Sequence, residues 1–313
     1  MYLPLVFIVG LIFGGQKFDS NKLDFAKRGD EYRIWVFFTD KNNSSLYPIT
    51  KRAEIRREKV NNIVKPDWHD LNVSDPYITH LKGLGFNILN ESRWLNAVTI
   101  KCQINDFEIL NSLPFVKKIE PVMLAKKKIY EDLSKPKETN RTFLYGDSQN
   151  QMEQINAINA HSLGYYGQGV RILYIDTGFD LSHEVFDSIQ VINQFDFINN
   201  DSVTSNETEQ EFQNNQDDHG SKCLSVLSGF KEGQLIGPAF KSEYLLAKTE
   251  IVEEEIQQEE DNYIAALEWG ESLGADITVA SIGYVDWYNY EDLDGDTAPI
   301  TVAVDVASNL GVL

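Results

Sequence analysis

Cysteine is scarce in this chain of 313 residues, which contains only Cys102 and Cys223. Two cysteines exclude a disulfide framework of the kind that stabilises small secreted domains. Each of them lies among apolar residues, so we expect both to be small core side chains. The fold must therefore depend on hydrophobic burial, for which 42% hydrophobic and 12% aromatic residues are sufficient.

Basic residues are rare in the second half of the chain. Residues 144–313 hold 5 Lys and Arg against 31 Asp and Glu, a net charge of −26. Residues 1–143 hold 23 Lys and Arg against 17 Asp and Glu, a net charge of +6. The total of −20 argues against nucleic acid as a partner, and the split indicates two pieces of opposite charge.

The first fifteen residues, MYLPLVFIVGLIFGG, form an apolar run that is too short to span a bilayer. The run lies where a secretory signal peptide is found, so we interpret residues 1–15 as a signal peptide. We expect a secreted or cell-surface protein with no stable membrane span. No Lys or Arg precedes the run and no clear small-x-small site follows it, so an apolar strand or a simple anchor is the alternative.

The basic half predicts a small α+β domain over residues 30–123. Its order of elements is that of a split β-α-β-β-α-β module. Strands are predicted at 32–40, 86–92, 94–103 and 115–122, and helices at 49–63, 75–84 and 104–113. The charge-rich stretch 49–63 is typical of a surface helix. Residues 124–148 are polar and contain Pro136, which predicts a linker.

The acidic half predicts a doubly wound α/β domain over residues 149–313. Nearly continuous apolar stretches at 170–176, 190–197, 244–250 and 276–283 predict parallel strands, and helices are predicted at 219–229, 259–275 and 297–311. In such a domain, binding and catalytic sites lie at the carboxyl ends of the strands.

Asp176 is at such a strand end, in the stretch RILYIDTGFD, and His219 begins a predicted helix 43 positions later. Burying a carboxylate costs several kcal/mol unless it has a partner. An Asp that accepts a hydrogen bond from His Nδ1 fixes the tautomer and stabilises the imidazolium formed when Nε2 takes a proton from serine. We therefore interpret Asp176 as the group that orients His219.

Three stretches resemble motifs of the subtilisin-like serine proteases. ILYIDTGFD resembles the aspartate motif, DDHGSKCLSVLSG the histidine motif, and ADITVASIGY the strand that lines the substrate groove. Asp176 precedes His219 in the chain, as in the order Asp, His, Ser of that family. The resemblance implies that Asp176 and His219 are catalytic and that Ser281, Ile282 and Gly283 bind substrate.

The resemblance covers most of residues 149–313 and is closest to a secreted bacterial subset of the family. Residues 30–123 resemble the N-terminal prosegment of such proteases. The family implies a serine endopeptidase that cleaves polypeptides by acyl transfer and needs no cofactor for its chemistry. It also implies that the prosegment acts as an intramolecular chaperone and inhibitor. We expect the opposite charges of the two pieces to favour docking, with docking by apolar contacts alone as the alternative.

The nucleophile of the family is absent, because the sequence has no G-T-S-x-A-x-P motif and no A-G-N segment for the oxyanion. Ser148, Ser272, Ser281 and Ser308 lie in other contexts. Val312 and Leu313 have the pattern of a new buried strand after a helix that ends at Gly311. We therefore expect a fragment that stops before the catalytic serine and is inactive alone.

Two other classes of function remain as alternatives. One is a catalytically inactive binding module on the subtilisin fold. The other is an acidic calcium-binding protein, for which Asp292, Asp294 and Asp296 alternate as in a calcium loop, although Thr297 replaces the usual Gly and Ala303 the usual Glu. A solvated acidic turn is the simpler interpretation, and structural calcium stays open. We expect the acidic stretch 250–261 to be an exposed loop.

Overall fold

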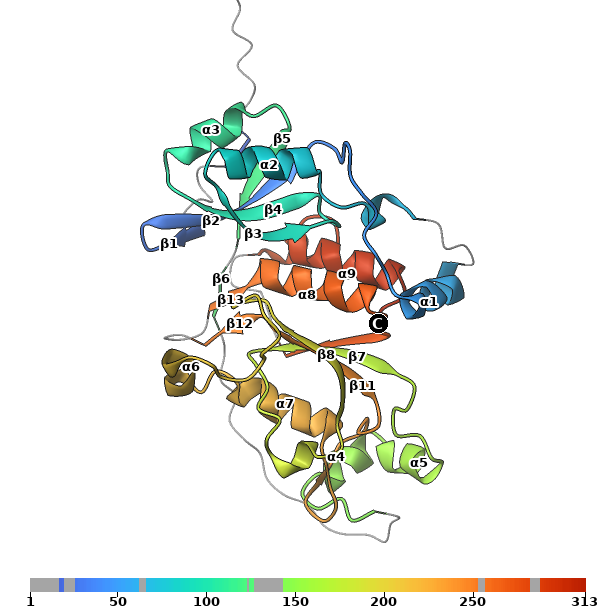
Figure 1. Cartoon of the computed structure of the whole chain (residues 1–313). Helices are drawn as coiled ribbons and strands as arrows, with labels where there is room; N and C mark the ends of the chain where they lie inside the picture. The colour runs from blue at the N-terminus through green and yellow to red at the C-terminus, as the bar shows by residue number, and fades with distance from the viewer. Residues whose placement is uncertain are drawn as a thin grey trace, which may run out of the picture.

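An antiparallel sheet forms the N-terminal domain of the computed structural model, which describes residues 17–19, 26–61, 66–122, 124–126, 143–252, 257–281 and 288–313. Its strands are β2 (Glu31–Phe38), β3 (Asn87–Ser92), β4 (Ala97–Cys102) and β5 (Val116–Pro121), in the order β3-β4-β2-β5, and β1 (Lys27–Arg28) pairs with β2. Helices α2 (Asp75–Gly83) and α3 (Asp106–Ser112) cover one face (Figure 1). The predicted split β-α-β-β-α-β module is confirmed.

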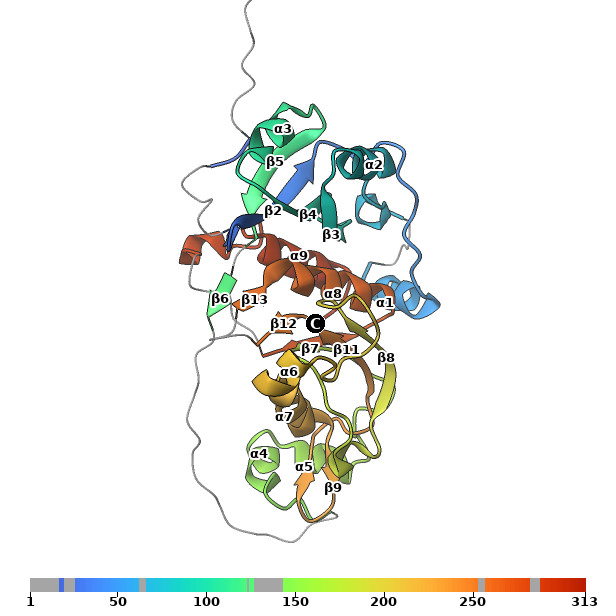
Figure 2. The same ribbon diagram turned by 60° about the vertical axis from the view of Figure 1, so that its left-hand side comes forward.

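A parallel sheet forms the C-terminal domain. Its strands are β7 (Arg171–Asp176), β8 (Gln190–Asp196), β11 (Glu243–Lys248) and β14 (Ile277–Ala280), in the order β14-β7-β11-β8. Helix α7 (Asp218–Ser228) lies on one face, whereas α8 (Glu260–Ser272) and α9 (Pro299–Asn309) lie on the other (Figure 2). Both faces of the central strands β7 and β11 are buried, as their apolar composition predicts, and the doubly wound α/β fold is confirmed.

The remaining elements are short. They are α1 (Lys51–Asn61), η2 (Trp68–Asp70), β6 (Leu124–Lys126), α4 (Gln149–Gln154), α5 (Ala157–Ser162), η3 (Glu184–Phe186), α6 (Glu209–Asn214), β9 (Phe230–Lys231), β10 (Leu235–Ile236), β12 (Glu250–Ile251), β13 (Gln257–Glu259) and η4 (Tyr290–Asp292). β6 occupies the start of the predicted linker, and the predicted signal peptide lies outside the described residues. Among the described residues, no helix has the length and apolar character needed to cross a membrane.

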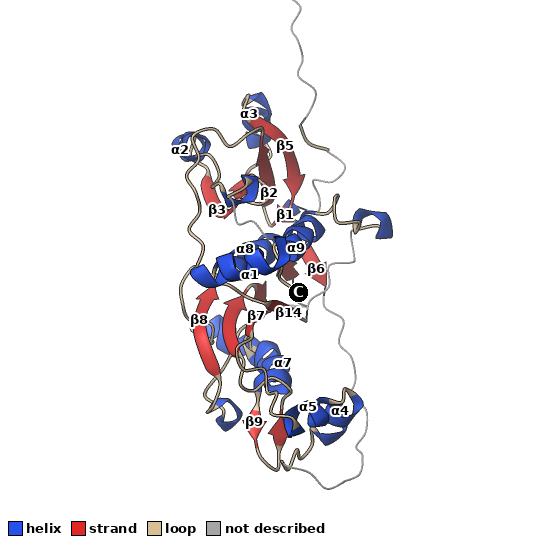
Figure 3. Ribbon diagram, turned by 90° about the vertical axis from the view of Figure 1, so that its right-hand side faces the viewer, coloured by secondary structure: helices blue, strands red, loops and turns tan. Residues whose placement is uncertain are grey.

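The two domains share a hydrophobic core. Strand β2 alternates between two faces: Ile34, Val36 and Phe38 pack under α2 and α3, whereas Trp35 and Phe37 point to the other side. On that side they join a cluster with residues of α8 and α9, among them Tyr263, Ile264, Leu267, Ala303 and Ala307. Helices α8 and α9 therefore lie as a layer between the two sheets (Figure 3).

The described parts of the acidic stretch 250–261 are not the exposed loop that we expected, and residues 253–256 lie outside the described residues. Glu250, Glu260 and Asp261 are each 0% exposed. Asp261 accepts hydrogen bonds from Arg33 and Thr99 of the N-terminal domain, and Glu260 accepts them from the Tyr288 hydroxyl and the Ile300 amide. The expectation was wrong because these partners are supplied by segments far away in the sequence.

Glu260 makes stability depend on pH. Burial raises the pKa of Glu260 to about 7, although Tyr288 and Ile300 donate to it. Because an unfolded glutamate titrates near 4.3, the protonated native form is favoured at low pH, and this stability is lost as the pH rises from about 4.3 towards 7. Glu260→Gln should therefore raise the free energy of unfolding at pH 8 by about 1–3 kcal/mol and change it little at pH 4.

Urea denaturation at several pH values measures this effect, with Glu209→Gln as the control because Glu209 is an exposed carboxylate. Parallel pH curves for Glu260→Gln and the unsubstituted chain would contradict the assignment.

Candidate active site

Asp176 ends β7 and is 0% exposed. Its Oδ1 accepts a hydrogen bond from the Thr177 amide at 2.7 Å, and its own carbonyl accepts one from the Thr249 amide at 3.0 Å. Gly178 comes two residues after Asp176 and has a φ of +141°, a backbone conformation that residues other than glycine rarely adopt. The D-T-G sequence therefore ends the strand sharply and leaves the carboxylate at the carboxyl edge of the sheet.

His219 is the second residue of α7, which starts at Asp218. Its Nδ1 donates to Asp176 Oδ1 at 2.6 Å, and its side chain is 30% exposed. The next residue must be small, because a Cβ on Gly220 would lie 2.2 Å from the Gly178 carbonyl oxygen and 3.0 Å from Asp176 Cβ. The helix can thus approach β7 closely enough for the two side chains to pair.

Gln216 joins the segments around this pair. Its Nε2 donates to the carbonyls of Thr177 at 2.6 Å and Glu250 at 2.5 Å, and its Oε1 accepts from the Val252 amide at 2.6 Å. The end of β7, the start of α7 and β12 are therefore held together by one buried side chain. Nothing in the local sequence distinguishes Gln216 from the polar residues around it.

Cys223 is not the core side chain that we expected. Its Sγ lies 3.6 Å from His219 Nε2, on the side of the imidazole that faces away from Asp176, and it is partly exposed. The four-residue spacing on one helix places the two side chains on the same face, so this spacing could have predicted the contact. Cys102 is buried as expected.

The Asp176 carboxylate raises the pKa of His219 to about 10, with a smaller contribution from the Cys223 thiol. A histidine whose pKa is raised by folding contributes stability below its unfolded value of about 6.5, and this stability is lost as the pH rises through about 10. The imidazole is therefore protonated at neutral pH in this arrangement.

Titration of the histidine ring protons by NMR tests this assignment, and the chain has only 5 histidines to resolve. One resonance should titrate well above pH 8, and Asp176→Asn should lower its pKa towards 6.5. If the variant leaves the highest histidine pKa unchanged, the pair does not form as described.

Of the predicted substrate-binding residues, Ser281 is exposed and directly follows β14. Because Ala280 is paired with Ile175 in the parallel ladder, Ser281 lies at the same sheet edge as Asp176. Ile282 and Gly283 lie outside the described residues. The structure therefore brings Ser281 to the edge that carries Asp176 and His219.

The acidic residues weighed as a calcium loop form turns in the structure. Asp294 accepts hydrogen bonds from the amides of Asp296 and Thr297, and Asp292 from the Asn289 amide, as in ordinary turns. Within the described ranges, their carboxylates do not converge with other ligand groups.

One carboxylate group of the C-terminal domain does converge: oxygens of Asp196, Asp201 and Glu207 lie within 4.8 Å of one another. The buried Lys248 ammonium pairs with Asp196 at 2.9 Å and with Glu211. This lysine supplies a positive charge to the cluster from within the protein.

A small antiparallel sheet connects the two domains beside the pair. β6 pairs with β13, with Leu124 opposite Glu259 and Lys126 opposite Gln257, and β13 pairs with β12. Gln216 ties β12 to the end of β7, and β13 lies between β12 and β6.

Comparison with known proteins gives a family for the N-terminal domain and a fold for the whole chain. Residues 33–140 match the family model of the peptidase S8 propeptide domain of Bacteroidota. No curated protein matches the chain.

Two solved proteases share the fold. Fervidolysin from Fervidobacterium pennivorans, a keratinolytic enzyme related to subtilisin, is 17% identical over 92% of this chain and 40% of its own, with a TM-score of 0.54. The epidermin leader peptide processing serine protease from Staphylococcus aureus is 13% identical over 91% of this chain and 59% of its own, with a TM-score of 0.57. An alanine variant of that protease gives 14% identity over 91% and 60%, with a TM-score of 0.56.

This chain spans between 40% and 60% of the length of these proteases. The propeptide match and the fold agree with the motifs around Asp176 and His219. The N-terminal domain therefore belongs to the peptidase S8 propeptide family, and the chain as a whole has the fold of the subtilisin-like proteases.

Proposed function

We propose that the protein is a secreted serine endopeptidase in which Asp176 and His219 act with a serine that lies outside residues 1–313. The observation that carries the proposal is the 2.6 Å hydrogen bond from His219 Nδ1 to the buried Asp176 carboxylate at the carboxyl edge of the parallel sheet. This bond leaves Nε2 directed away from Asp176. A serine hydroxyl would have to lie on that side of the imidazole, next to Nε2.

In the proposed reaction the serine Oγ attacks the scissile carbonyl carbon while His219 Nε2 takes the hydroxyl proton. His219 then gives this proton to the leaving amine, and a water molecule hydrolyses the acyl-enzyme by the reverse sequence. Asp176 stays ionised and stabilises the imidazolium. Ser281, Ile282 and Gly283 would hold the substrate backbone by strand addition, and no step needs a cofactor.

The base must be neutral to accept a proton, whereas Asp176 raises the pKa of His219 to about 10. We therefore expect activity to increase with pH through the His219 pKa.

The prosegment would inhibit the enzyme through β6. This strand adds to β13 by backbone pairing, as an extended peptide adds to a sheet edge, in the same small sheet as β12, which Gln216 ties to the end of β7. The shared core of β2 with α8 and α9 would support folding of the protease domain before release.

The direct test is to purify the secreted protein and assay casein hydrolysis with and without phenylmethylsulfonyl fluoride, a reagent that modifies active-site serines. We expect hydrolysis that the reagent abolishes. Hydrolysis that a metal chelator stops and the reagent leaves unchanged would contradict the serine mechanism. A well-folded protein that neither cleaves casein nor reacts with the reagent would instead support an inactive binding module.

A further inference from the structure

Helix α1 does not pack on the sheet of its own domain. The core under that sheet is closed by α2 and α3, and α1 contributes no residue to it. We predicted a surface helix, yet Ala53, Arg56 and Arg57 are 0%, 5% and 5% exposed. Their burial comes from the C-terminal domain, because α1 lies against the ends of α8 and α9 (Figure 1).

Arginines of α1 bind the carboxyl ends of these two helices. Arg56 donates to the Glu271 carbonyl in the last turn of α8 at 3.3 Å and to the Leu310 carbonyl at the end of α9 at 3.2 Å. Just beyond α8, Arg52 Nε donates to the Gly274 carbonyl at 3.0 Å and Arg56 to the Ala275 carbonyl at 2.6 Å. The last carbonyls of a helix have no partner within the helix and carry partial negative charge. The guanidinium groups of α1 therefore satisfy acceptors that would otherwise need water.

Two glycines permit this close approach. A Cβ on Gly274 would lie 2.7 Å from Arg52 Cγ, and one on Gly311 would lie 2.6 Å from Val60 Cγ2. Both glycines also have a positive φ, of +85° and +88°, as helix C-terminal residues often do. The surface that receives α1 is thus shaped by the C-terminal domain itself.

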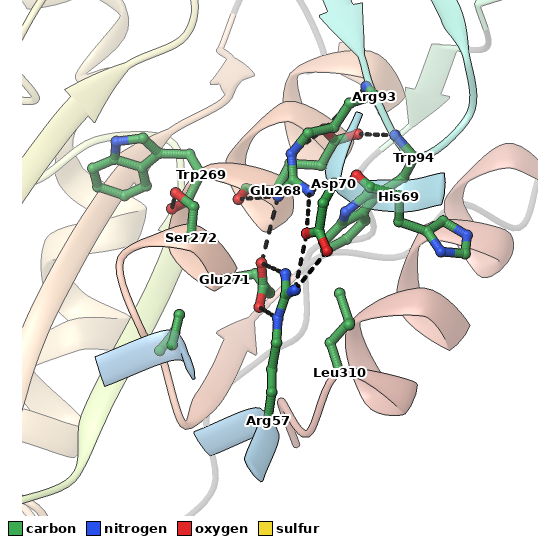
Figure 4. Close-up of polar contacts among 12 residues, drawn as sticks. Arg57, His69, Asp70, Arg93, Trp94, Glu268, Trp269, Glu271, Ser272 and Leu310 are labelled. Atoms are coloured by element: carbon green, nitrogen blue, oxygen red, sulfur yellow. Dashed lines mark hydrogen bonds and ion pairs between the residues drawn. The ribbon is translucent and has the colours of Figure 1, made fainter. Parts of the chain in front are cut away.

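A buried ionic cluster lies beside this contact (Figure 4). Arg57 binds Glu271 with two hydrogen bonds of 2.9 Å and Asp70 at 2.8 Å. Arg93 pairs with Glu268 at 3.5 Å and with Glu271 at 3.4 Å. The Ser92 hydroxyl and the Arg93 amide also donate to Glu268, at 2.6 and 3.1 Å.

The cluster is electrically balanced. It holds the guanidinium groups of Arg56, Arg57 and Arg93 and the carboxylates of Asp70, Glu268 and Glu271, with side chains between 0% and 8% exposed. The prosegment supplies all three cations and α8 supplies two of the three anions. A buried charge that loses its partner costs far more than a surface one, so each domain strongly disfavours a partner with mismatched charges.

We propose that α1, together with Arg93, is a recognition arm by which this prosegment selects its own protease domain. The partner that it fits is a subtilisin-fold domain with acidic side chains at positions 268 and 271 and glycine at position 274. The inference rests on the proposed function only in treating residues 143–313 as the domain that the prosegment serves. Its test involves no peptide hydrolysis, so failure of the peptidase proposal would leave it standing.

The test is hydrogen exchange of the full chain and of variants Arg57→Met, Glu271→Gln and the double variant. Either single change leaves an unbalanced buried charge, so amide protection in α1 and α8 should fall about 100-fold or more. The double variant restores neutrality of the buried cluster. The factor by which its amide protection falls should therefore be at least about tenfold smaller than the product of the factors for the two single variants. Protection in β2 and β4 should persist, which shows that the prosegment remains folded.

Lys51→Met is the matched control, since Lys51 is on the same helix and pairs with Glu54 at the surface. It should leave protection unchanged. Arg52→Met, at the partly exposed pair with Asp276, is a milder variant should the buried changes unfold the chain, and it should lower protection of α1 about tenfold. Three outcomes would overturn the recognition arm. The first is unchanged amide protection of α1 and α8 in Glu271→Gln, and the second is a loss of protection in the double variant equal to the product of the two single losses. The third is a loss of protection in β2 and β4 together with α1.

Discussion

In an active protease that contains this chain, His219→Ala or Asp176→Asn should lower kcat by about three to six orders of magnitude. Without His219 no group takes the serine proton. In Asp176→Asn the imidazole loses the carboxylate that holds its tautomer and stabilises its protonated form through a 2.6 Å hydrogen bond. Hydrolysis of a peptide amide substrate by the purified variants measures the effect.

Circular dichroism of both variants should remain native, because the changes remove one polar contact and no core volume. His183→Ala is the matched control, as His183 lies in the same domain and its Nδ1 accepts a bond from the Val185 amide rather than from a catalytic group. Near-normal amide hydrolysis by either His219→Ala or Asp176→Asn would remove that residue from the mechanism.

Replacing Asp261 by alanine should lower the free energy of unfolding of the joined domains by about 3–5 kcal/mol. The change leaves the Arg33 guanidinium, whose side chain is 9% exposed, without its carboxylate. Thr99 Oγ1, which donates to the same carboxylate oxygen at 2.6 Å, also loses this acceptor, and Asn90 Nδ2 loses one of its two acceptors. Urea denaturation at pH 7 measures the loss.

Burial alone would raise the pKa of Asp261, but the charge of Arg33 and the bonds from Thr99, Arg33 and Asn90 lower it. The stability from a carboxylate of lowered pKa is present above its unfolded value of about 3.9 and is lost as the pH falls through the native one. Asp261→Ala should therefore cost progressively less as the medium becomes more acidic.

The double variant Arg33→Met, Asp261→Leu should recover most of the stability, because it removes both buried charges. Asp218→Ala, at the exposed pair with Lys222, should cost less than about 1 kcal/mol. A loss for Asp261→Ala as small as that control would mean that the interface does not depend on this ion pair.

Opposite charges of the two halves meet in buried ion pairs, whereas the composition suggested long-range attraction between their surfaces. Long-range attraction between surfaces is screened within about 8–10 Å at physiological salt. The structure instead places charges of the two halves in buried contact, as at Arg57 and Glu271. It also shows an apolar contact between the two domains, and attraction through the overall charges stays a prediction.

The sequence by itself determined the main strands and helices of both domains and the pairing of Asp176 with His219. These features leave dense local signals: an apolar strand that ends on a carboxylate, Gly178 where the turn needs a positive φ, and Gly220 where a helix approaches a strand. Such constraints act over a few residues, so the pattern of residue types records them directly.

Only the tertiary structure decided which charged residues are buried. Arg56 and Arg57 lie in a stretch with the polar character of a surface helix, and Glu268 and Glu271 lie on a helix whose apolar residues already account for its packing. Their partners in the other domain are more than 170 residues away along the chain. Periodicity shows which face is apolar, but a charge can be buried only where a distant segment supplies its counter-charge and hydrogen bonds, and that depends on how the two domains dock.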